Sequence, residues 1–235
     1  MILLNAIHDQ HHEIPHELTL EMLAKVAVLA DYYDCRQSLF VYKNIWMPAL
    51  QKPIPATYSR DLILWIWVSW YFQLPVQFKQ ATSNAMTRRH GFITNLRLPI
   101  PADVIDAMND SRQEAIGALL DQLHDTRDDF LAGAQGCTWE CSFMVYGALS
   151  KHLASYDLLS PKPEVPFANH SYEELAMVVQ TFVSPRWRAS APDSVLHCCS
   201  ASCSSLLFGI PGHAIEGLNL QSFLPYYSPM PRSGS

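Results

Sequence analysis

Apolar residues recur every three or four positions through most of the chain, which is the spacing of helices that bury one face. The longest such pattern covers residues 101–131, where one side is apolar and most acidic residues lie on the other. Its apolar side consists of Ile105, Met108, Ile116, Leu119, Leu123 and Phe130. The pattern predicts an all-α protein built as a helical bundle.

Residues that commonly cap helices mark where several of these helices begin. Thr19 and Ser59 each precede an apolar periodic segment, and Ser171 forms a capping box with Glu174. The predicted helices cover residues 2–8, 20–35, 39–48, 60–73, 76–90, 101–131, 137–153 and 172–183.

The helix over residues 60–73 is apolar on nearly every side, so we expect other helices to enclose it. Its aromatic residues after the first turn are Trp65, Trp67, Trp70, Tyr71 and Phe72. Such a stripe is typical of a protein core, and any part of it that stays exposed would be an interaction surface.

Residues 136–153 carry two spaced cysteines on a strongly apolar helical pattern. If this helix begins near Cys137, then Cys137 and Cys141 lie one turn apart on the same face. Gly133 and Gly136 predict a turn ahead of the helix, so it should pack antiparallel to the long helix before it.

The helical pattern weakens after residue 184. From Pro185 the chain is rich in proline and serine, so we expect residues 185–235 to form an irregular, partly disordered tail. Two regions precede this tail, residues 1–50 and residues 51–184.

Composition and charge exclude several classes of partner. The net charge is -6, and the 16 basic residues are scattered, so the chain lacks a basic patch for nucleic acid. The most apolar run, residues 62–74, is shorter than the roughly 20 residues needed to span a bilayer. The N-terminus does not resemble a secretory signal, and six cysteines without a disulfide framework favour a reducing compartment. We expect a cytoplasmic or nuclear protein with no nucleic-acid and no membrane partner.

Eight short stretches stand out by their order and spacing. They are ILLNAIH, LAKVAVLADYYDC, YSRDLILWIWVSW, LPIPADVIDA, SRQEAIGALLDQLHD, GCTWECSFMVYGALSKHL, LLSPKPEVPF and HCC. Together they extend to about Cys199 and resemble the helical portion of a family of fungal BTB/POZ-domain proteins.

This resemblance implies that residues 1–50 correspond to the helical second half of a BTB fold, and residues 51–184 to a family-specific helical bundle. In such proteins the BTB strands precede the ILLNAIH helix, so we expect the N-terminal part to be truncated relative to a complete BTB fold. The resemblance also implies a non-catalytic role in protein–protein interaction or scaffolding.

A structural zinc site is the strongest candidate for chemistry. Its candidate ligands are Cys137, Cys141, His197 and Cys199. Zinc prefers four nitrogen or sulfur ligands in a tetrahedron, and this set would fix the tail to the cysteine helix. Cys198 and Cys203 are alternative ligands in the tail. Cysteine is also common as a small buried core residue, so the spacing of Cys137 and Cys141 leaves both interpretations open.

The alternative function is a metal-dependent phosphohydrolase. His124 and Asp125 resemble the adjacent His-Asp pair of the all-helical HD phosphohydrolases, with Asp121 and Asp128 nearby. The further histidine ligands of such an enzyme are not found at helical positions around the pair. Charges spaced four residues apart on a solvated helix explain these residues equally well. We therefore expect that the chain is not an enzyme, and assign no catalytic or cofactor-binding residue.

Overall fold

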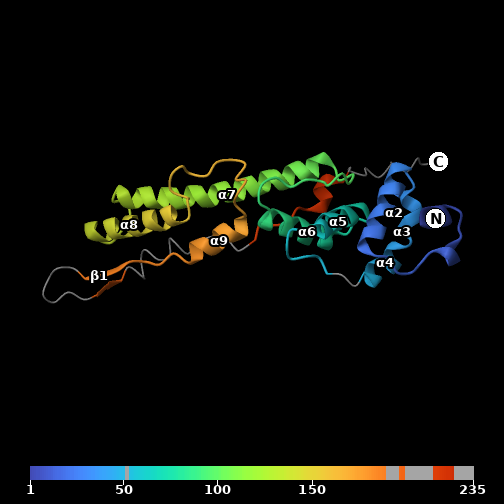
Figure 1. Cartoon of the computed structure of the whole chain (residues 1–235), viewed down its shortest axis with the longest axis horizontal. Coiled ribbons are helices and arrows are strands. Elements are labelled where there is room, and N and C mark those ends of the chain that lie inside the picture. The colour runs from blue at the N-terminus through green and yellow to red at the C-terminus, as the bar shows by residue number, and fades with distance from the viewer. Residues whose placement is uncertain (51–52, 189–195, 199–213, 225–235) are drawn as a thin grey trace, which may run out of the picture. The chain divides into compact units, whose positions relative to one another are not determined.

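The computed structural model describes residues 1–50, 53–188, 196–198 and 214–224 (Figure 1). The predicted all-α class is confirmed, because helices dominate and the strands in this part of the chain form one short antiparallel pair. The helices are α1 (Ile2–Ile7), α2 (Leu20–Tyr32), α3 (Arg36–Phe40), α4 (Lys43–Ala49), α5 (Arg60–Tyr71), α6 (Pro75–Arg88), α7 (Ala102–Leu131), α8 (Trp139–Ser155) and α9 (Tyr172–Gln180). The shorter elements are the 3-10 turns η1 (His11–Glu13) and η2 (Leu220–Phe223) and the strands β1 (Arg186–Arg188) and β2 (Leu196–Cys198).

The chain divides into two compact units. Unit 1 contains Met1–Ala85, Thr94–Met108 and the described part of Glu216–Ser235, and unit 2 contains Met86–Ile93 and the described part of Asn109–Ile215. The region boundaries predicted at residues 50 and 184 remain predictions. Within the described residues, no helix has both the length and the apolar character needed to cross a membrane.

Helices α2 and α5 pack together in the centre of unit 1. Thr19 and Ser59 cap them as predicted, each accepting a hydrogen bond from a backbone N–H in the first turn. The indole Nε1 of Trp67 donates to the carbonyl oxygen of Ala24 at 3.2 Å, which fixes the two helices against each other. Trp65, Trp67 and Tyr71 of α5 are buried in the core, whereas Trp70 is partly exposed.

The helix predicted over residues 39–48 is two helices in the structure, α3 and α4. The chain turns at Val41 and Tyr42, and the Tyr42 ring then stacks on Trp46 with 5.0 Å between ring centroids. Trp46 is fully buried, and its Nε1 donates to the carbonyl oxygen of Pro15 at 2.9 Å. The turn between the helices thus places one large indole in the core of unit 1.

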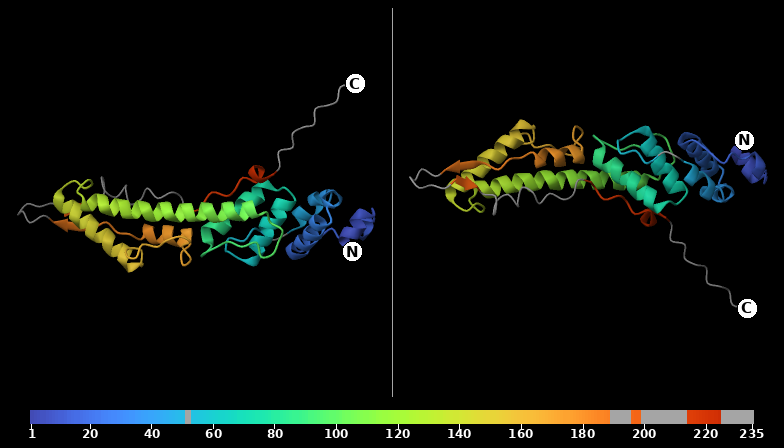
Figure 2. Two further views of the ribbon diagram at one scale, coloured as in Figure 1. Left: turned by 90° about the horizontal axis from the view of Figure 1, so that it is seen from above. Right: turned by 90° about the horizontal axis from the view of Figure 1, so that it is seen from below.

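Helices α7 and α8 form the predicted helical hairpin of unit 2, and they lie side by side in every view (Figures 1 and 2). Gly133 and Gly136 have φ angles of +72° and +110°, which glycine adopts without a steric penalty. Ser142 donates hydrogen bonds to the carbonyl oxygens of Phe130 and Gln135, and so closes the turn.

Helix α9 begins after Ser171, whose hydroxyl accepts the backbone N–H of Glu174 at 3.3 Å, which confirms Ser171 as the N-cap. The chain beyond α9 packs on α8, where the Phe182 ring stacks on His152 with 4.7 Å between centroids. Strand β1 then pairs antiparallel with β2, and Trp187 lies opposite His197. A short strand pair therefore forms inside the region predicted to be irregular.

Candidate interaction surface

An apolar groove of about 790 Å³ lies between α1 and α2 in unit 1. It is lined by Met1, Ile2, Leu3, Leu4 and Ile7, by Met22, Lys25, Val26 and Leu29, and by Tyr33 and Cys35. Leu4 remains 52% exposed and Leu29 49% exposed. Apolar side chains gathered on a surface mark binding sites far more often than single exposed ones do. We call this feature the α1–α2 groove.

Helix α1 is apolar on both of its sides. Leu3 and Ala6 are buried, and the helix contacts α2 and α3, whereas Leu4 and Ile7 face outward. A helix of six residues is not stable alone, so its buried side must hold it in place. The outward side is not needed for this packing and is presented to solvent.

Charged side chains lie at the edge of the groove. Lys25 lines the groove and pairs with Glu21 at 3.2 Å, and Arg60 from α5 also binds the Glu21 carboxylate, with one contact at 3.0 Å. Hydrogen bonds from Arg60 and Lys25 lower the pKa of Glu21 to about 2. Two cations share the Glu21 carboxylate, and the nearby Asp61 also acts electrostatically on Arg60, so the charges of these four side chains balance.

The end of the groove near Cys35 is held by the neighbouring Arg36. The Arg36 guanidinium lies 5.0 Å from the Tyr71 ring centroid and donates to the Tyr71 carbonyl oxygen. Burial raises the pKa of Tyr71 to about 12, and its hydroxyl has no hydrogen-bond partner among the described residues. The tyrosine is therefore neutral and acts here as packing for the arginine rather than as an acid or base.

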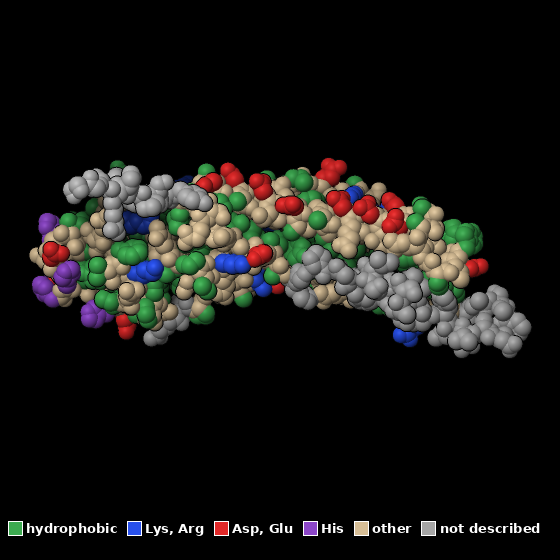
Figure 3. Space-filling view, turned by 180° about the vertical axis from the view of Figure 1, so that it is seen from behind, with side chains coloured by type: hydrophobic (Ala, Val, Ile, Leu, Met, Phe, Trp, Pro, Cys, Tyr) green, Lys and Arg blue, Asp and Glu red, His purple; other side chains and the backbone are tan. Residues whose placement is uncertain are grey.

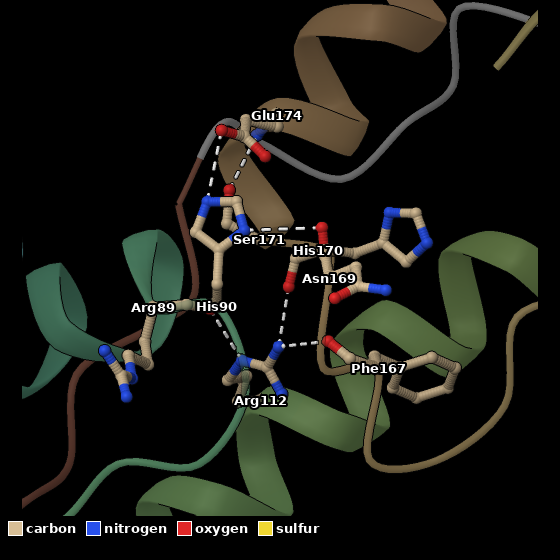
Figure 4. A network of polar contacts seen from close by, with 8 residues as sticks. All are labelled: Arg89, His90, Arg112, Phe167, Asn169, His170, Ser171 and Glu174. Carbon is tan, nitrogen blue, oxygen red and sulfur yellow. Dashed lines mark hydrogen bonds and ion pairs between the residues drawn. The ribbon is translucent and has the colours of Figure 1, made fainter.

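A polar cluster of unit 2 surrounds Arg112 of α7 (Figure 4). Arg112 is 1% exposed, and it donates four hydrogen bonds to backbone carbonyl oxygens. The acceptors are Arg89 at 2.9 Å, Pro166 at 3.0 Å, Phe167 at 2.9 Å and His170 at 2.6 Å. Burial and the charge of Arg89 lower the pKa of Arg112. The guanidinium joins α7 to the end of α6 and to the loop before α9.

A second contact of this cluster joins α6 to α9 (Figure 4). The Nε2 of His90 lies 3.1 Å from a Glu174 carboxylate oxygen, and its Nδ1 lies 3.3 Å from the carbonyl oxygen of Asn169. Arg88 binds Glu173 at 3.0 Å beside it. These polar groups are used within the fold, so the cluster is structural.

The candidate zinc ligands are only partly described. Thr138 is the N-cap of α8, so Cys137 precedes the helix instead of lying on its face, and it is exposed. Cys141 is buried against Phe130 and Val145. The His197 side chain and Cys199 lie outside the described residues, so the zinc site stays a prediction. The premise that both cysteines share one helical face is wrong, because α8 begins two residues after Cys137.

His124 and Asp125, the pair of the alternative phosphohydrolase hypothesis, point in different directions. His124 is buried, and its Nε2 lies 2.8 Å from the carbonyl oxygen of Leu158 after α8. Asp125 is exposed. Figure 3 shows acidic side chains gathered over α7, and in unit 2 the exposed ones include Asp110, Glu114, Asp121, Asp125 and Asp128. The structure therefore uses His124 as a link between α7 and the end of α8, and Asp125 as part of a solvated face.

Histidine side chains collect near η1, as Figure 3 shows. His11 forms a hydrogen bond with the Tyr42 hydroxyl, and His12 lies 3.6 Å from Glu13. Across the described ranges, no three His, Cys, Asp or Glu side chains are grouped closely enough to hold a metal ion.

Comparison with models of protein families, with curated protein sequences and with solved structures finds no match for this chain. The resemblance to fungal BTB/POZ-domain proteins therefore remains a prediction based on the sequence.

Two of these features were not singled out by the sequence analysis. Arg112 falls between Met108 and Ile116 on the apolar side of α7, and an arginine at such a position signals a buried cation. The α1–α2 groove had a weaker signal, which is that α1 is almost entirely apolar although it is short.

Proposed function

We propose that this chain is a non-catalytic protein–protein interaction or scaffolding protein, and that the α1–α2 groove binds an amphipathic helix of a partner protein. The observation that carries the proposal is the gathering of exposed aliphatic side chains, including Leu4 and Leu29, in a groove between two helices. Binding of a helix in such a groove is a common mode of protein recognition. The resemblance to BTB/POZ-domain proteins supports the same class of function.

Charge defines the partner helix further. Lys25 is the charged side chain that lines the groove, and it stays 65% exposed although it pairs with Glu21. A partner helix with an acidic residue beside its aliphatic face would therefore fit better than one with a basic residue there. An exposed charge pair contributes little affinity, so the aliphatic contacts carry most of the binding.

Site-specific photocrosslinking tests this proposal. A photoreactive amino acid at position 29, in the groove, should crosslink the full chain to a discrete partner in fungal cells. The same group at Met177, which is 51% exposed in α9 of unit 2, serves as the matched control. Adding Leu4→Glu should abolish the crosslink from position 29. Equal crosslinking from both positions, or none from position 29, would contradict the proposal.

A structural zinc ion held by Cys137, Cys141, His197 and Cys199 forms part of the same proposal. The exposed thiol of Cys137 is accessible to a ligand from the tail. Zinc bound by four protein ligands would stabilise the fold and would not act in catalysis.

A further inference from the structure

Residues Glu216–Phe223 lie along α6 in unit 1, in the manner of a bound peptide (Figure 2). We call this segment the C-terminal arm. The backbone N–H of Leu218 donates to the Thr82 hydroxyl at 3.0 Å. The Glu216 carboxylate binds the Lys79 ammonium at 2.6 Å, and this contact lowers the pKa of Glu216. The arm is therefore held by one main-chain contact and one charge contact.

The arm crosses α6 at Gly217. A Cβ atom at Gly217 would lie 1.8 Å from the carbonyl oxygen of Lys79 and 2.6 Å from its carbonyl carbon. Both atoms are helix backbone and do not move aside as a flexible side chain does. Glycine, which has no Cβ, is therefore the only residue that permits this close approach of the arm to α6.

Apolar contacts also hold the arm on the surface formed by Phe78, Lys79 and Thr82 of α6, which we call the seat. Leu220 of the arm is 1% exposed, and the Phe223 ring lies 6.4 Å from the Phe78 ring between centroids. Thr82 is fully buried and donates its own proton to the carbonyl oxygen of Phe78 at 2.8 Å. Its hydroxyl oxygen is thereby oriented to accept the N–H of the arm.

A hollow of about 670 Å³ remains beside the seated arm. It is lined by Pro75, Val76 and Lys79 of α6 and by residues 216–220 of the arm. Val76 is 73% exposed there. The seat is therefore open along one side, and a chain segment can reach it from solvent.

We propose that this face of α6 is a peptide-binding site for segments of the pattern acid–Gly–Leu–x–Leu, and that the chain's own arm occupies it until a partner segment displaces it. Any peptide of this pattern could make the contacts that hold the arm. Its backbone N–H would bind the Thr82 hydroxyl, its glycine would lie against the Lys79 backbone, its carboxylate would pair with Lys79, and its second leucine would be buried. A tethered segment has a high effective concentration, so it fills the site when no competitor is present. This site is separate from the α1–α2 groove.

The test uses the full chain carrying Gly217→Val, which places a side chain against the backbone of Lys79 and releases the arm. The probe is a fluorescein-labelled peptide of residues 215–223. By fluorescence anisotropy we expect saturable binding to the Gly217→Val chain, and binding at least roughly tenfold weaker to the native chain, whose site is occupied. The same peptide carrying Gly217→Val is the matched control and should bind neither chain.

A second pair of variants tests the charge contact and guards against misfolding. The double variant Lys79→Glu, Gly217→Val should bind the native-sequence peptide more weakly than the Gly217→Val chain does. A peptide carrying Glu216→Lys should bind this double variant well, because the charge pair is restored with the signs exchanged. If Gly217→Val lowers the helix content by circular dichroism, the double variant Glu216→Lys, Leu220→Asp releases the arm instead, by reversing its charge contact and removing its buried leucine. A folded, arm-released chain that binds no peptide up to about 1 mM would overturn the proposal.

Discussion

The Nη2 of Arg112 donates a 2.6 Å hydrogen bond to the carbonyl oxygen of His170, 58 residues further along the chain. Arg112 is 1% exposed and has no carboxylate partner among the described residues. Backbone carbonyl dipoles therefore compensate its charge, and the loop before α9 takes its shape from this one side chain. A buried cation is costly unless its N–H groups are satisfied, so this loop and Arg112 depend on each other.

Replacement of Arg112 should destabilise unit 2 strongly. Arg112→Met removes four hydrogen bonds to carbonyl oxygens in buried or partly buried positions, and we expect the free energy of unfolding to fall by about 3–5 kcal/mol. Urea denaturation followed by circular dichroism measures the loss. Arg97→Met, at an exposed arginine, is the control and should change stability by less than about 0.5 kcal/mol. A loss below about 1 kcal/mol for Arg112→Met would mean that the carbonyl groups find other partners.

Acidification should weaken the fold through His170. Burial lowers the pKa of His170 below its usual 6.5, an effect that His90 and Arg112 reinforce and Glu174 opposes. The unfolded chain then binds the proton more readily. The stabilisation is present above pH 6.5 and is lost as the pH falls through the lower pKa of the folded state.

Urea unfolding between pH 7 and pH 5 measures this effect. His170→Gln keeps the backbone carbonyl that Arg112 uses, and should lose less stability than the native chain over this range. His16→Gln, at an exposed histidine, should behave like the native chain. Identical pH profiles for His170→Gln and the native chain would contradict the assignment.

Two glycines of the α7–α8 hairpin should respond to alanine in opposite ways. Gly147 lies inside α8 with open space around its Cβ position, so Gly147→Ala should stabilise the protein by about 0.5–1 kcal/mol. Gly136 has a φ of +110°, and its Cβ would lie 3.1 Å from the backbone nitrogen of Ser142. Gly136→Ala should therefore destabilise it by about 1–3 kcal/mol. Thermal denaturation of both variants measures these effects. Shifts of the melting temperature in the same direction for both variants would contradict the prediction.

His124 and Asp125 should differ in their importance for stability. His124→Ala removes the buried hydrogen bond to Leu158, and should cost about 1–3 kcal/mol in unfolding free energy. Asp125→Ala, at an exposed position, should cost less than about 0.5 kcal/mol. Neither variant should alter hydrolysis of phosphoesters. Native phosphoesterase activity that disappears in both folded variants would support the hydrolase hypothesis instead.

Zinc analysis of the purified full chain tests the predicted structural site. We expect about one equivalent of zinc in the native chain and a clear loss in Cys137→Ser, because a tetrahedral site needs all four ligands. Cys35→Ser is the control and should retain the metal, since Cys35 is not among the predicted ligands. If the native protein contained no zinc, the predicted site would be wrong and Cys141 would serve only as a core residue.

The sequence by itself determined the helices and most of their ends, because these depend on neighbours within one turn. Thr19, Ser59 and Ser171 act as caps where the sequence predicts them, since a cap needs only the first backbone N–H groups of its own helix. The break between α3 and α4 was not predicted. It depends on the burial of Trp46, whose partner Pro15 lies 31 residues earlier.

Only the tertiary structure decided which side chains are left over for binding. The outward side of α1 and the glycine crossing of the C-terminal arm depend on surfaces brought together from distant parts of the chain, such as Lys79 and Glu216, 137 residues apart. Periodicity shows that a helix has an apolar face, but it does not show whether another element covers that face. For this reason the all-α class followed from the sequence, whereas the α1–α2 groove and the seat on α6 required the fold.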